Sequence, residues 1–364
     1  MNQSLDRYHR QILLPGFGEE GQRRLLDSTA LILGCGALGS VAADLLARAG
    51  VGRLLIVDRD IVETTNLQRQ VLFDERDAAE GLPKAVAAKR RIARNNSQVE
   101  VTAIVDDIHY GNIERLALDA DVLVDGLDNF ETRYLANDLA VKTGLPYVYG
   151  AAVGTAGMGF SVLPHGSGNL PWESAQGGSF ATPCFRCLFD EPPPPGSSPT
   201  CDTVGVVSAV VGLIANVQVA ETLKILTGQY SRVRRSLLSV DLWQNEYLNL
   251  GVDDAYSKGD CTCCKQRRFD YLDGKSGSAA VSLCGRDAVQ LRHREGASAP
   301  DLELLARRFG DGQTARLNEF MLVLHITDGD KPYEITVFRD GRAIVKGTHE
   351  PAVARTLFAR YIGS

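Results

Sequence analysis

The fold of this chain is decided by residues 30–39, which read ALILGCGALG. Four apolar residues lead into a glycine-rich turn, and residues 40–50 behind it carry apolar side chains at helical spacing, so the pattern predicts strand, turn and helix. In such a unit Gly34 permits the turn, Gly36 lets the backbone approach a phosphate, and Gly39 lets the helix pack closely on the strand. The first turn of the helix then offers free N–H groups to an anion.

Two further apolar segments are predicted strands, and each leads to a carboxylate. Residues 53–57 end at Asp58, where a ribose-binding carboxylate is expected in a mononucleotide or dinucleotide fold. Residues 121–125 place Asp128 near the carboxyl end of the sheet, where ligands bind in open α/β folds and a carboxylate can hold Mg²⁺. For Asp128 and Asn129 the alternative is a helix cap. Together the three segments predict a Rossmann-like α/β fold with a mainly parallel central sheet.

A cluster of amides and cations separates ATP from a nicotinamide cofactor. Asn66, Gln68 and Arg69 follow soon after the second strand, and Lys84 comes next along the chain. An arginine can clamp phosphate oxygens in bidentate fashion, and a lysine adds a compact point charge. Two cations suit a triphosphate, whereas a nicotinamide oxidoreductase has no need of them. We therefore expect ATP and Mg²⁺ at this site.

Four short motifs occur in an order that is known from one group of enzymes. They are RYHRQ at 7–11, the glycine loop at 34–39, NLQRQ at 66–70 and GLPK at 81–84. With these motifs the chain resembles the ThiF/MoeB/HesA-type adenylyltransferases, which are related to the ubiquitin-activating enzymes. The resemblance covers roughly the first three quarters of the chain.

The resemblance implies that the C-terminal Gly-Gly carboxylate of a ubiquitin-like sulfur carrier, ThiS-like or MoaD-like, attacks the α-phosphate of ATP. The products are a carrier acyl-adenylate and pyrophosphate, and the step needs no protein nucleophile. Positioning and charge neutralisation by Arg69, Lys84 and Mg²⁺ would supply the catalysis. The residues expected to contact the nucleotide or its metal are Gly34, Gly36, Gly39, Asp58, Asn66, Gln68, Arg69, Lys84, Asp128 and Asn129.

Arg10 has an expected role that depends on a second copy of the chain. In the family, an arginine of the N-terminal motif reaches into the nucleotide site of the partner subunit, so the resemblance makes Arg10 a catalytic residue supplied in trans. That role requires a homodimer. The alternative is an ordinary surface arginine on an N-terminal helix.

Two cysteine pairs form a second, independent pattern. Cys184 and Cys187 are spaced as Cys-x-x-Cys, and so are Cys261 and Cys264, with Cys263 between them. Four thiolates at this spacing predict a closed structural Zn²⁺ site, and the family spacing favours Cys261 with Cys264 as ligands. Disulfides are disfavoured because we expect no secretory signal before the fold, and a thioredoxin-like role is disfavoured because each pair has a partner pair. This cysteine usage fits a reducing cytoplasm.

Residues 190–203 are rich in proline and predict a mobile loop within the catalytic domain. Relatives have a crossover loop here that covers the carrier's tail, and some form a persulfide or acyl link through a cysteine that Cys201 matches. We expect an apolar helix from near Thr203, whose N-terminal amides would favour the Cys201 thiolate. The alternative for Cys201 is an inert small residue under the loop, and Cys35 and Cys284 are predicted to be small core residues.

Composition excludes some classes of function. The net charge of −6 and the lack of a lysine-rich run argue against general nucleic-acid binding. The apolar segment 204–226 is interrupted by polar residues and predicts a buried core helix rather than a membrane span. With 364 residues, of which 44% are hydrophobic, the chain can bury one large core and one smaller core.

The smaller core is expected after the cysteine pairs, which gives predicted domains at 1–267 and 268–364. The second is predicted to be a small α+β module. Its expected elements are strands at 320–326, 333–338 and 342–345, a turn at 340–341, and helices at 301–309 and 351–361. The module lacks the catalytic cysteine loop of a rhodanese. Its start at 283–286, LCGR, and its hairpin at 338–342, FRDGR, resemble the tail of thiazole-pathway adenylyltransferases, which favours a ThiS-like carrier.

Several alternatives stay open at this point. A nicotinamide oxidoreductase leaves Arg69, Lys84 and the cysteine pairs unexplained, and a non-catalytic carrier-binding scaffold gives the phosphate residues no use. A TcdA-like tRNA cyclodehydratase shares the use of ATP, but the zinc cysteines and the acidic charge disfavour it. The motifs do not choose between thiamine and molybdopterin biosynthesis. Nor do they choose between Cys201 and a separate sulfurtransferase as the source of sulfur.

Overall fold

The structure is a computed structural model, and it describes residues 5–166, 170–173, 179–193, 200–276, 281–283, 287–291, 300–309, 315–328, 330–339 and 341–362. Contacts between residues divide the chain into two compact units. The first comprises Met1–Pro194 and Val206–Ser276, and the second comprises Pro195–Gly205 and Gly277–Ser364. The domain limits expected from the sequence stay a prediction.

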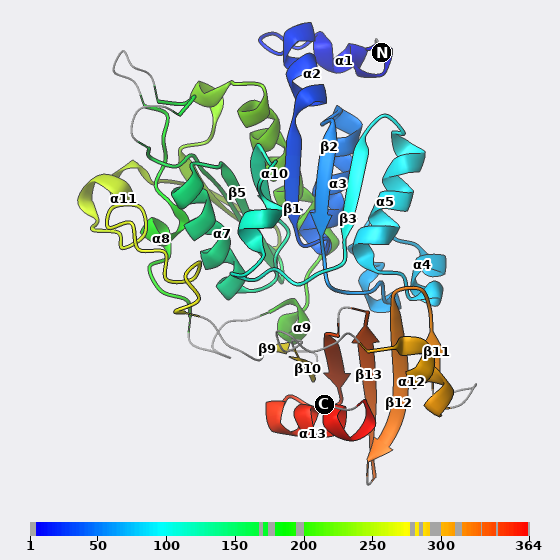
Figure 1. The fold of residues 1–364 in the computed structure, drawn as a ribbon. Coiled ribbons are helices and arrows are strands. Elements are labelled where there is room, and N and C mark those ends of the chain that lie inside the picture. Colours follow the sequence, from blue (N-terminus) through cyan, green and yellow to red (C-terminus); the bar gives the residue numbers. More distant parts are fainter. Residues whose placement is uncertain are drawn as a thin grey trace. The chain divides into compact units, whose positions relative to one another are not determined.

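The first unit is built on an eight-stranded sheet with the order β3-β2-β1-β4-β5-β6-β7-β8. Figure 1 shows β1, β2 and β3 next to one another. Its strands are β1 (Thr29–Leu33), β2 (Arg53–Val57), β3 (Glu100–Ile104), β4 (Val122–Asp125), β5 (Tyr147–Val153), β6 (Ala156–Val162), β7 (Ser236–Asp241) and β8 (Glu246–Gly251). Neighbours from β3 to β5 are parallel, and β6, β7 and β8 are added antiparallel. The predicted Rossmann-like, mainly parallel sheet is confirmed.

The helices of this unit cover both faces of the sheet. They are α1 (His9–Ile12), α2 (Gly18–Asp27), α3 (Ala37–Ala49), α4 (Glu75–Glu80), α5 (Lys84–Asn95), α6 (Ile113–Leu116), α7 (Phe130–Thr143), α8 (Phe185–Leu188), α10 (Ser208–Leu226) and α11 (Asp253–Lys258). Three short 3₁₀ turns accompany them, η1 (Asp6–Tyr8), η2 (Thr64–Asn66) and η3 (Tyr230–Arg232).

The order of the strands fixes which helix lies on which face. The chain moves from β1 to β2 through α3, and from β4 to β5 through α7, in opposite directions along the sheet. Because such crossovers are right-handed, α3 and α7 lie on opposite faces. β1 and β4 are neighbours at the point where the direction reverses. Open α/β sheets bind their ligands at this switch point.

α10 is the core helix that the apolar segment predicted. Among the described residues it is the one helix long and apolar enough to cross a membrane by length and composition, and over half of its apolar window is buried in the protein. It packs on α3, β5 and β6. Gln218 on this helix donates to the backbone oxygens of Asp125, at 2.8 Å, and Val148, at 3.1 Å. These are the contacts of a core helix.

The start of this helix differs from the prediction. The helix expected from near Thr203 is broken, because α9 (Cys201–Val204) is a separate turn of helix and α10 begins further along. Gly205 between them has a φ of 77°, and Val207 is extended. A residue with positive φ does not continue a right-handed helix. Cys201 therefore does not lie at the N-terminus of the long helix, and that argument for a stabilised thiolate is wrong.

The second unit is a six-stranded antiparallel sheet with the order β11-β12-β13-β14-β10-β9. Its strands are β9 (Val281–Leu283), β10 (Ala288–Leu291), β11 (Ala315–Leu317), β12 (Met321–Asp328), β13 (Lys331–Phe338) and β14 (Ala343–Lys346). Two helices, α12 (Leu302–Phe309) and α13 (Pro351–Tyr361), add Leu305 and Leu357 to a core that contains Leu324. The predicted small α+β module is confirmed. Asp340 of the predicted turn and Cys284 lie outside the described residues.

Candidate nucleotide site and cysteine cluster

The glycine loop is packed backbone against backbone on the loop that follows β4. Gly34 has a φ of 86°, which is the left-handed region that glycine adopts without strain. A Cβ on Gly34 would lie 2.7 Å from the Gly126 carbonyl oxygen, and one on Gly39 would lie 2.0 Å from the Gly34 carbonyl oxygen. No side chain fits at either position, so the loop and the start of α3 approach the switch point as closely as backbone allows.

Asp58 lies directly under this loop. Its Oδ2 accepts a hydrogen bond from the Cys35 N–H at 2.6 Å, and its Oδ1 accepts one from the Asp60 N–H at 2.7 Å. Burial raises the pKa of Asp58, and the nearby Lys84 ammonium opposes that rise. The carboxylate thus joins the end of β2 to the glycine loop. Cys35 is fully buried, as predicted for a small core residue.

Lys84 is the first residue of α5, and its side chain is only 3% exposed. Its Nζ lies 3.0 Å from Asp60 Oδ2, and its N–H donates to the Asp60 carbonyl oxygen at 2.9 Å. Next to this pair, Arg59 Nη1 lies 2.9 Å from Asp107 Oδ1. The predicted phosphate lysine is therefore oriented by a carboxylate that the sequence reasoning missed. Its signal was the Asp-x-Asp spacing of Asp58 and Asp60 after β2.

Residues 66–70 begin at the end of the 3₁₀ turn η2, and the buried Asn66 side chain hydrogen-bonds to the backbone at the start of that turn. Asn66 is 3% exposed, and its Oδ1 accepts from the Glu63 N–H at 3.1 Å. Gln70 is equally buried, and its Nε2 lies 4.0 Å from where a Cβ on Gly36 would be. Arg69 Nη1 donates to the Thr65 carbonyl oxygen at 3.1 Å. Gln68 is exposed.

Asp128 and Asn129 occupy the connection between β4 and α7. Asn129 Oδ1 accepts from the Thr132 N–H at 2.9 Å, so Asn129 caps α7, which was the alternative offered for this pair. Its Nδ2 donates to Asp128 Oδ1 at 3.2 Å. Asp128 is exposed at the carboxyl end of β4. It joins Asp107 and Asp60 in keeping the pKa of Arg59 above its usual value, although burial acts in the opposite direction.

Two further predicted site residues lie on short helices. Arg10 is exposed on α1. Cys201 is half-buried in α9, which belongs to the second unit by its contacts. Their roles, like those of the nucleotide residues, stay predictions.

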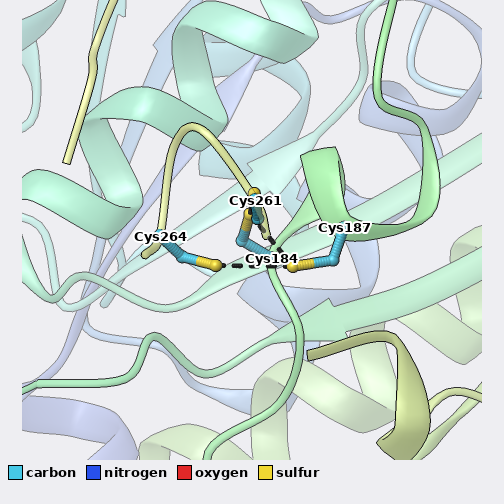
Figure 2. Close-up of side chains that lie close together, drawn as sticks. All are labelled: Cys184, Cys187, Cys261 and Cys264. Atoms are coloured by element: carbon cyan, nitrogen blue, oxygen red, sulfur yellow. Dashed lines mark hydrogen bonds between the residues drawn. The ribbon is translucent and has the colours of Figure 1, made fainter. Parts of the chain in front are cut away.

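The four predicted metal ligands converge from two distant segments (Figure 2). Cys184 Sγ lies 3.8 Å from Cys187 Sγ and 3.6 Å from Cys261 Sγ, and Cys187 Sγ lies 3.4 Å from Cys264 Sγ. All four sulfurs are within 4.8 Å of one another. A tetrahedral Zn²⁺ with bonds of about 2.3 Å separates its sulfurs by about 3.8 Å. The cluster therefore fits a tetrahedral zinc ion.

The electrostatics of these thiols also favour a cation. Hydrogen bonding, first from Cys187, holds the pKa of Cys184 well below its ordinary value. The interaction with Cys184 raises the pKa of Cys187 and of Cys264 in turn. The interaction with Cys184 also opposes ionisation of Cys261, but hydrogen bonds from Cys187 and Cys264 outweigh it and lower the pKa of Cys261 to about 7. Ionisation of Cys184 therefore disfavours ionisation of Cys187 and Cys264. A bound divalent cation is what allows all four to ionise together.

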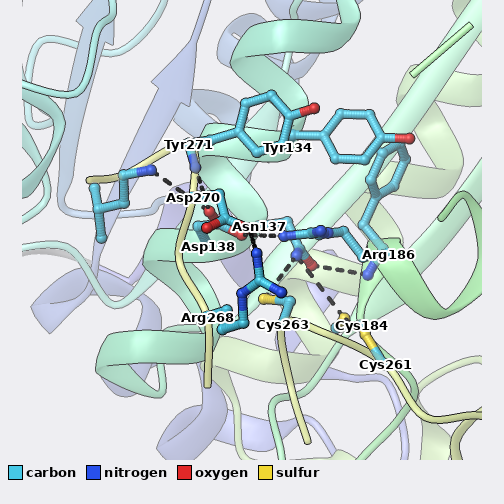
Figure 3. A network of polar contacts seen from close by, with 12 residues as sticks. Tyr134, Asn137, Asp138, Cys184, Arg186, Cys261, Cys263, Arg268, Asp270 and Tyr271 are labelled. Atoms are coloured by element: carbon cyan, nitrogen blue, oxygen red, sulfur yellow. Dashed lines mark hydrogen bonds and ion pairs between the residues drawn. The ribbon is translucent and has the colours of Figure 1, made fainter. Parts of the chain in front are cut away.

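Asn137 on helix α7 contacts the cysteine cluster (Figure 3). Asn137 Nδ2 lies 3.4 Å from Cys263 Sγ and 3.8 Å from Cys184 Sγ, and Asn137 Oδ1 accepts from the Phe185 N–H at 2.8 Å. Cys263 is fully buried and lies outside the group of four sulfurs. This arrangement agrees with the predicted ligand pair of Cys261 and Cys264.

Asp138, the next residue of α7, binds the chain beyond the cysteines. Its Oδ2 accepts from the Tyr271 N–H at 3.0 Å, and its Oδ1 lies 3.7 Å from Arg186 Nη1. Figure 3 shows these groups around the fully buried carboxylate. Burial raises the pKa of Asp138 to about 6. Sequence reasoning missed Asn137 and Asp138, because nothing in the helical pattern marks the face that meets the cysteines.

Comparison with known families decides the relationship. The ThiF family matches residues 8–263, which is most of the first unit. This chain belongs to the ThiF family. The resemblance drawn from the four motifs is thereby confirmed.

Relatives of this ThiF-family protein include named adenylyltransferases. A Bacillus subtilis protein named sulfur carrier protein ThiS adenylyltransferase is 42% identical over 359 residues, covering 98% of this chain and 99% of the relative. A Thermus thermophilus protein named sulfur carrier protein adenylyltransferase is 39% identical over 250 residues, covering 69% of this chain and 88% of the relative. The crystal structure of E. coli MccB with ATP is 24% identical with a TM-score of 0.56, covering 68% of this chain and 72% of that one. That last likeness shows the shared fold alone.

Proposed function

We propose that this ThiF-family protein adenylates the C-terminal Gly-Gly carboxylate of a ubiquitin-like sulfur carrier, with a ThiS-like carrier favoured over a MoaD-like one. The observation that carries the proposal is the 42% identity to a ThiS adenylyltransferase across nearly the whole of both chains. That match extends through the C-terminal part of the second unit, which lies beyond the residues 8–263 matched by the ThiF family. Thiamine biosynthesis is accordingly the pathway we favour.

In the proposed reaction a carboxylate oxygen of the carrier bonds to the α-phosphorus of ATP. The bond from that phosphorus to the bridging oxygen breaks, and pyrophosphate leaves. The backbone at Gly34, Gly36 and Gly39 would line the phosphates, and Asp58 would bind the ribose. Lys84, oriented by Asp60, would neutralise charge that develops on the phosphate oxygens.

The remaining polar residues complete this assignment. Arg69 would add a second cation to the phosphates, while Asn66, Gln68 and Asn129 would orient them. Asp128 offers an exposed carboxylate, the ligand type that Mg²⁺ prefers, two residues after Gly126, which packs against the glycine loop. Bound Mg²⁺ would further neutralise the phosphates.

The cysteine cluster is assigned a structural role. Cys184, Cys187, Cys261 and Cys264 would hold Zn²⁺ as a closed four-thiolate site. Such a site leaves no open position for substrate. It would tie the segment after β8 to α7 and α8.

Three further assignments follow from the family resemblance. Arg10 would enter the nucleotide site of a partner subunit in a cytoplasmic homodimer. Residues 190–203 would act as the crossover loop over the carrier's tail. Sulfur would then reach the acyl-adenylate through Cys201 or from a separate sulfurtransferase.

The test is ATP–pyrophosphate exchange with purified ThiS-like and MoaD-like carriers, each intact or lacking its last two glycines. We expect exchange with the intact ThiS-like carrier and none with either truncated carrier. Exchange with the intact MoaD-like carrier alone would move the protein to molybdopterin biosynthesis. No exchange with either intact carrier would contradict the proposal.

A further inference from the structure

Arg133 on α7 is a fully covered arginine that the nucleotide motifs leave without a role. Its Nε lies 3.2 Å from Asp125 Oδ2, and its Nη2 donates to the Leu127 carbonyl oxygen at 2.6 Å and, more weakly, toward the Gly150 carbonyl oxygen at 3.4 Å. Only 7% of the side chain is exposed. Burying a charge costs desolvation free energy, so the contacts of Arg133 indicate its function.

Asp125, the last residue of β4, completes the arrangement from the other side. Its Oδ2 also accepts from the Tyr147 hydroxyl at 2.6 Å, and its Oδ1 accepts from the Leu127 N–H at 2.8 Å. The N–H of Leu127 is therefore held by Asp125, and its C=O by Arg133. Both backbone groups of one residue are fixed by one buried ion pair.

The residue after Leu127 is Asp128, the proposed metal ligand. Asn129 then caps the helix that carries Arg133. The turn from 125 to 129 is thus closed on itself, with Gly126 pressed against Gly34 and Gly39 of the glycine loop. The peptide before Asp128 cannot rotate without breaking a buried hydrogen bond or striking that loop.

We propose that Arg133 and Asp125 are positioning residues that set the direction of the Asp128 carboxylate, and with it the affinity of the nucleotide site for Mg²⁺. The proposal rests on the adenylation site described above. A displacement of about 1 Å in a reacting group can cost on the order of 10²-fold in rate. The buried pair is the feature that prevents such a displacement.

A purely structural role for the pair is the competing explanation, and stability alone does not separate the two. Removing one partner of a buried ion pair destabilises a protein in either case. Dependence on Mg²⁺ does separate them. A positioning role raises the Mg²⁺ concentration needed for half-maximal activity, whereas general loss of stability leaves that concentration unchanged in the molecules that remain folded.

The experiment uses the full-length protein with Arg133→Lys and Tyr147→Phe. Lysine keeps the charge but not the fork that reaches both Asp125 and Leu127. Tyr147→Phe removes one donor to Asp125 and leaves Arg133 in place, so it serves if the first variant folds poorly. Leu139→Ala, in the buried C-terminal half of the same helix, is the control for destabilisation.

Two quantities are measured against Mg²⁺ concentration: the pyrophosphate exchange rate and the binding of a non-hydrolysable ATP analogue by calorimetry. We expect the half-saturating Mg²⁺ concentration to rise roughly tenfold in Arg133→Lys, and less in Tyr147→Phe, with the KM for the carrier changed less than twofold. Leu139→Ala keeps the wild-type value. In an Asp128→Asn background, Arg133→Lys produces no further rise.

The outcomes are distinguishable from failure of the proposed function. Wild-type Mg²⁺ dependence in folded Arg133→Lys and Tyr147→Phe would overturn the positioning role. So would a rise of equal size in Leu139→Ala or in the Asp128→Asn background. Wild-type protein that binds the analogue with Mg²⁺ but exchanges no pyrophosphate would contradict adenylation alone, and the calorimetric comparison would still decide the role of Arg133. Nucleotide binding by the wild type that is indifferent to Mg²⁺ would overturn the positioning role, whether or not pyrophosphate is exchanged.

Discussion

The two halves of helix α7 contact different sites, and each half uses different chemistry. In the N-terminal half Arg133 donates to a carboxylate and a carbonyl beside the candidate nucleotide site. In the C-terminal half Asn137 and Asp138 accept N–H groups from the segments that carry the cysteines. The N-terminal half fixes the conformation of the turn between β4 and α7. The second half joins segments that lie far apart in the sequence.

We therefore expect substitutions in the two halves of α7 to affect different properties, activity in one case and stability in the other. Changes around the N-terminal half should alter nucleotide chemistry, because the turn held there leads directly into Asp128, the proposed metal ligand. Changes around the C-terminal half should reach the free energy of unfolding, because the groups held there are covered by protein. Four experiments test this division.

Loss of the metal should have the largest effect, and it should fall on stability. With Cys264→Ser the zinc content should drop well below one ion per chain, and the melting temperature should fall by on the order of 10 °C or more, because three thiolates no longer close the site. Metal analysis and calorimetry measure the two. Cys263→Ser is the matched control and should retain its zinc, since Cys263 lies outside the group of four. An unaltered metal content in Cys264→Ser would refute the ligand assignment.

The next largest effect should fall on activity. Arg69→Ala or Lys84→Ala should lower carrier-dependent pyrophosphate exchange by about 10²- to 10³-fold, since each removes one cation from the proposed phosphate site. Arg48→Ala, on α3, removes an arginine whose side chain is 54% exposed and should leave the rate unchanged. Circular dichroism checks that the variants stay folded. Exchange that persists in Arg69→Ala and Lys84→Ala would remove both from the catalytic set.

Asn137→Ala tests the junction in the C-terminal half of α7. It leaves the buried Phe185 N–H without its acceptor, which should lower the free energy of unfolding by about 1–3 kcal/mol. Urea unfolding measures the change. Asn216→Ala on the exposed side of α10, where the amide donates to the Gly212 carbonyl oxygen, should change stability far less. Equal effects in the two variants would show that Asn137 is no special junction.

The smallest effect is a pH dependence at Asp138. Burial raises the pKa of this carboxyl to about 6, above the value of about 3.9 expected in the unfolded chain, so the native state holds the proton more tightly. The associated stability is fully present below the unfolded pKa and is lost as pH rises through 6. Relative to Asp138→Asn, the wild type should lose on the order of 1 kcal/mol between pH 5 and 7.5. A difference between the two proteins that stays constant over this range would contradict the shifted pKa.

The parts of this molecule that follow from local pattern could be predicted, and those that need two distant segments could not. The strand at β1, the glycine turn and the strand at β2 are written in short runs of apolar residues and glycines. The pairing of Lys84 with Asp60 was not predicted, because the Asp-x-Asp spacing after β2 marks Asp60 but does not show that the start of α5 lies beside it in space.

The break before α10 shows the opposite difficulty. The apolar run continues smoothly through Gly205, so its hydrophobic periodicity predicts one helix. The positive φ of Gly205 interrupts the helix, although the apolar pattern of the side chains continues. The cysteine cluster was predictable as a set of four, because metal-ligand spacing is a local signal, but the contact of Asn137 on α7 with it was not.

The contact between Gly34 and Gly126 also constrains how the chain folds. The two glycines lie on connections separated by β2, β3 and all that links them, and loop closure over such a distance is slow. The strand, turn and helix around Gly34 can form early from neighbouring residues, but the loop reaches its final shape only when β4 docks beside β1. In pulsed hydrogen exchange during refolding, the amide of Gly126, which donates to the Leu33 carbonyl oxygen, should become protected together with those of β4 and later than those of α3.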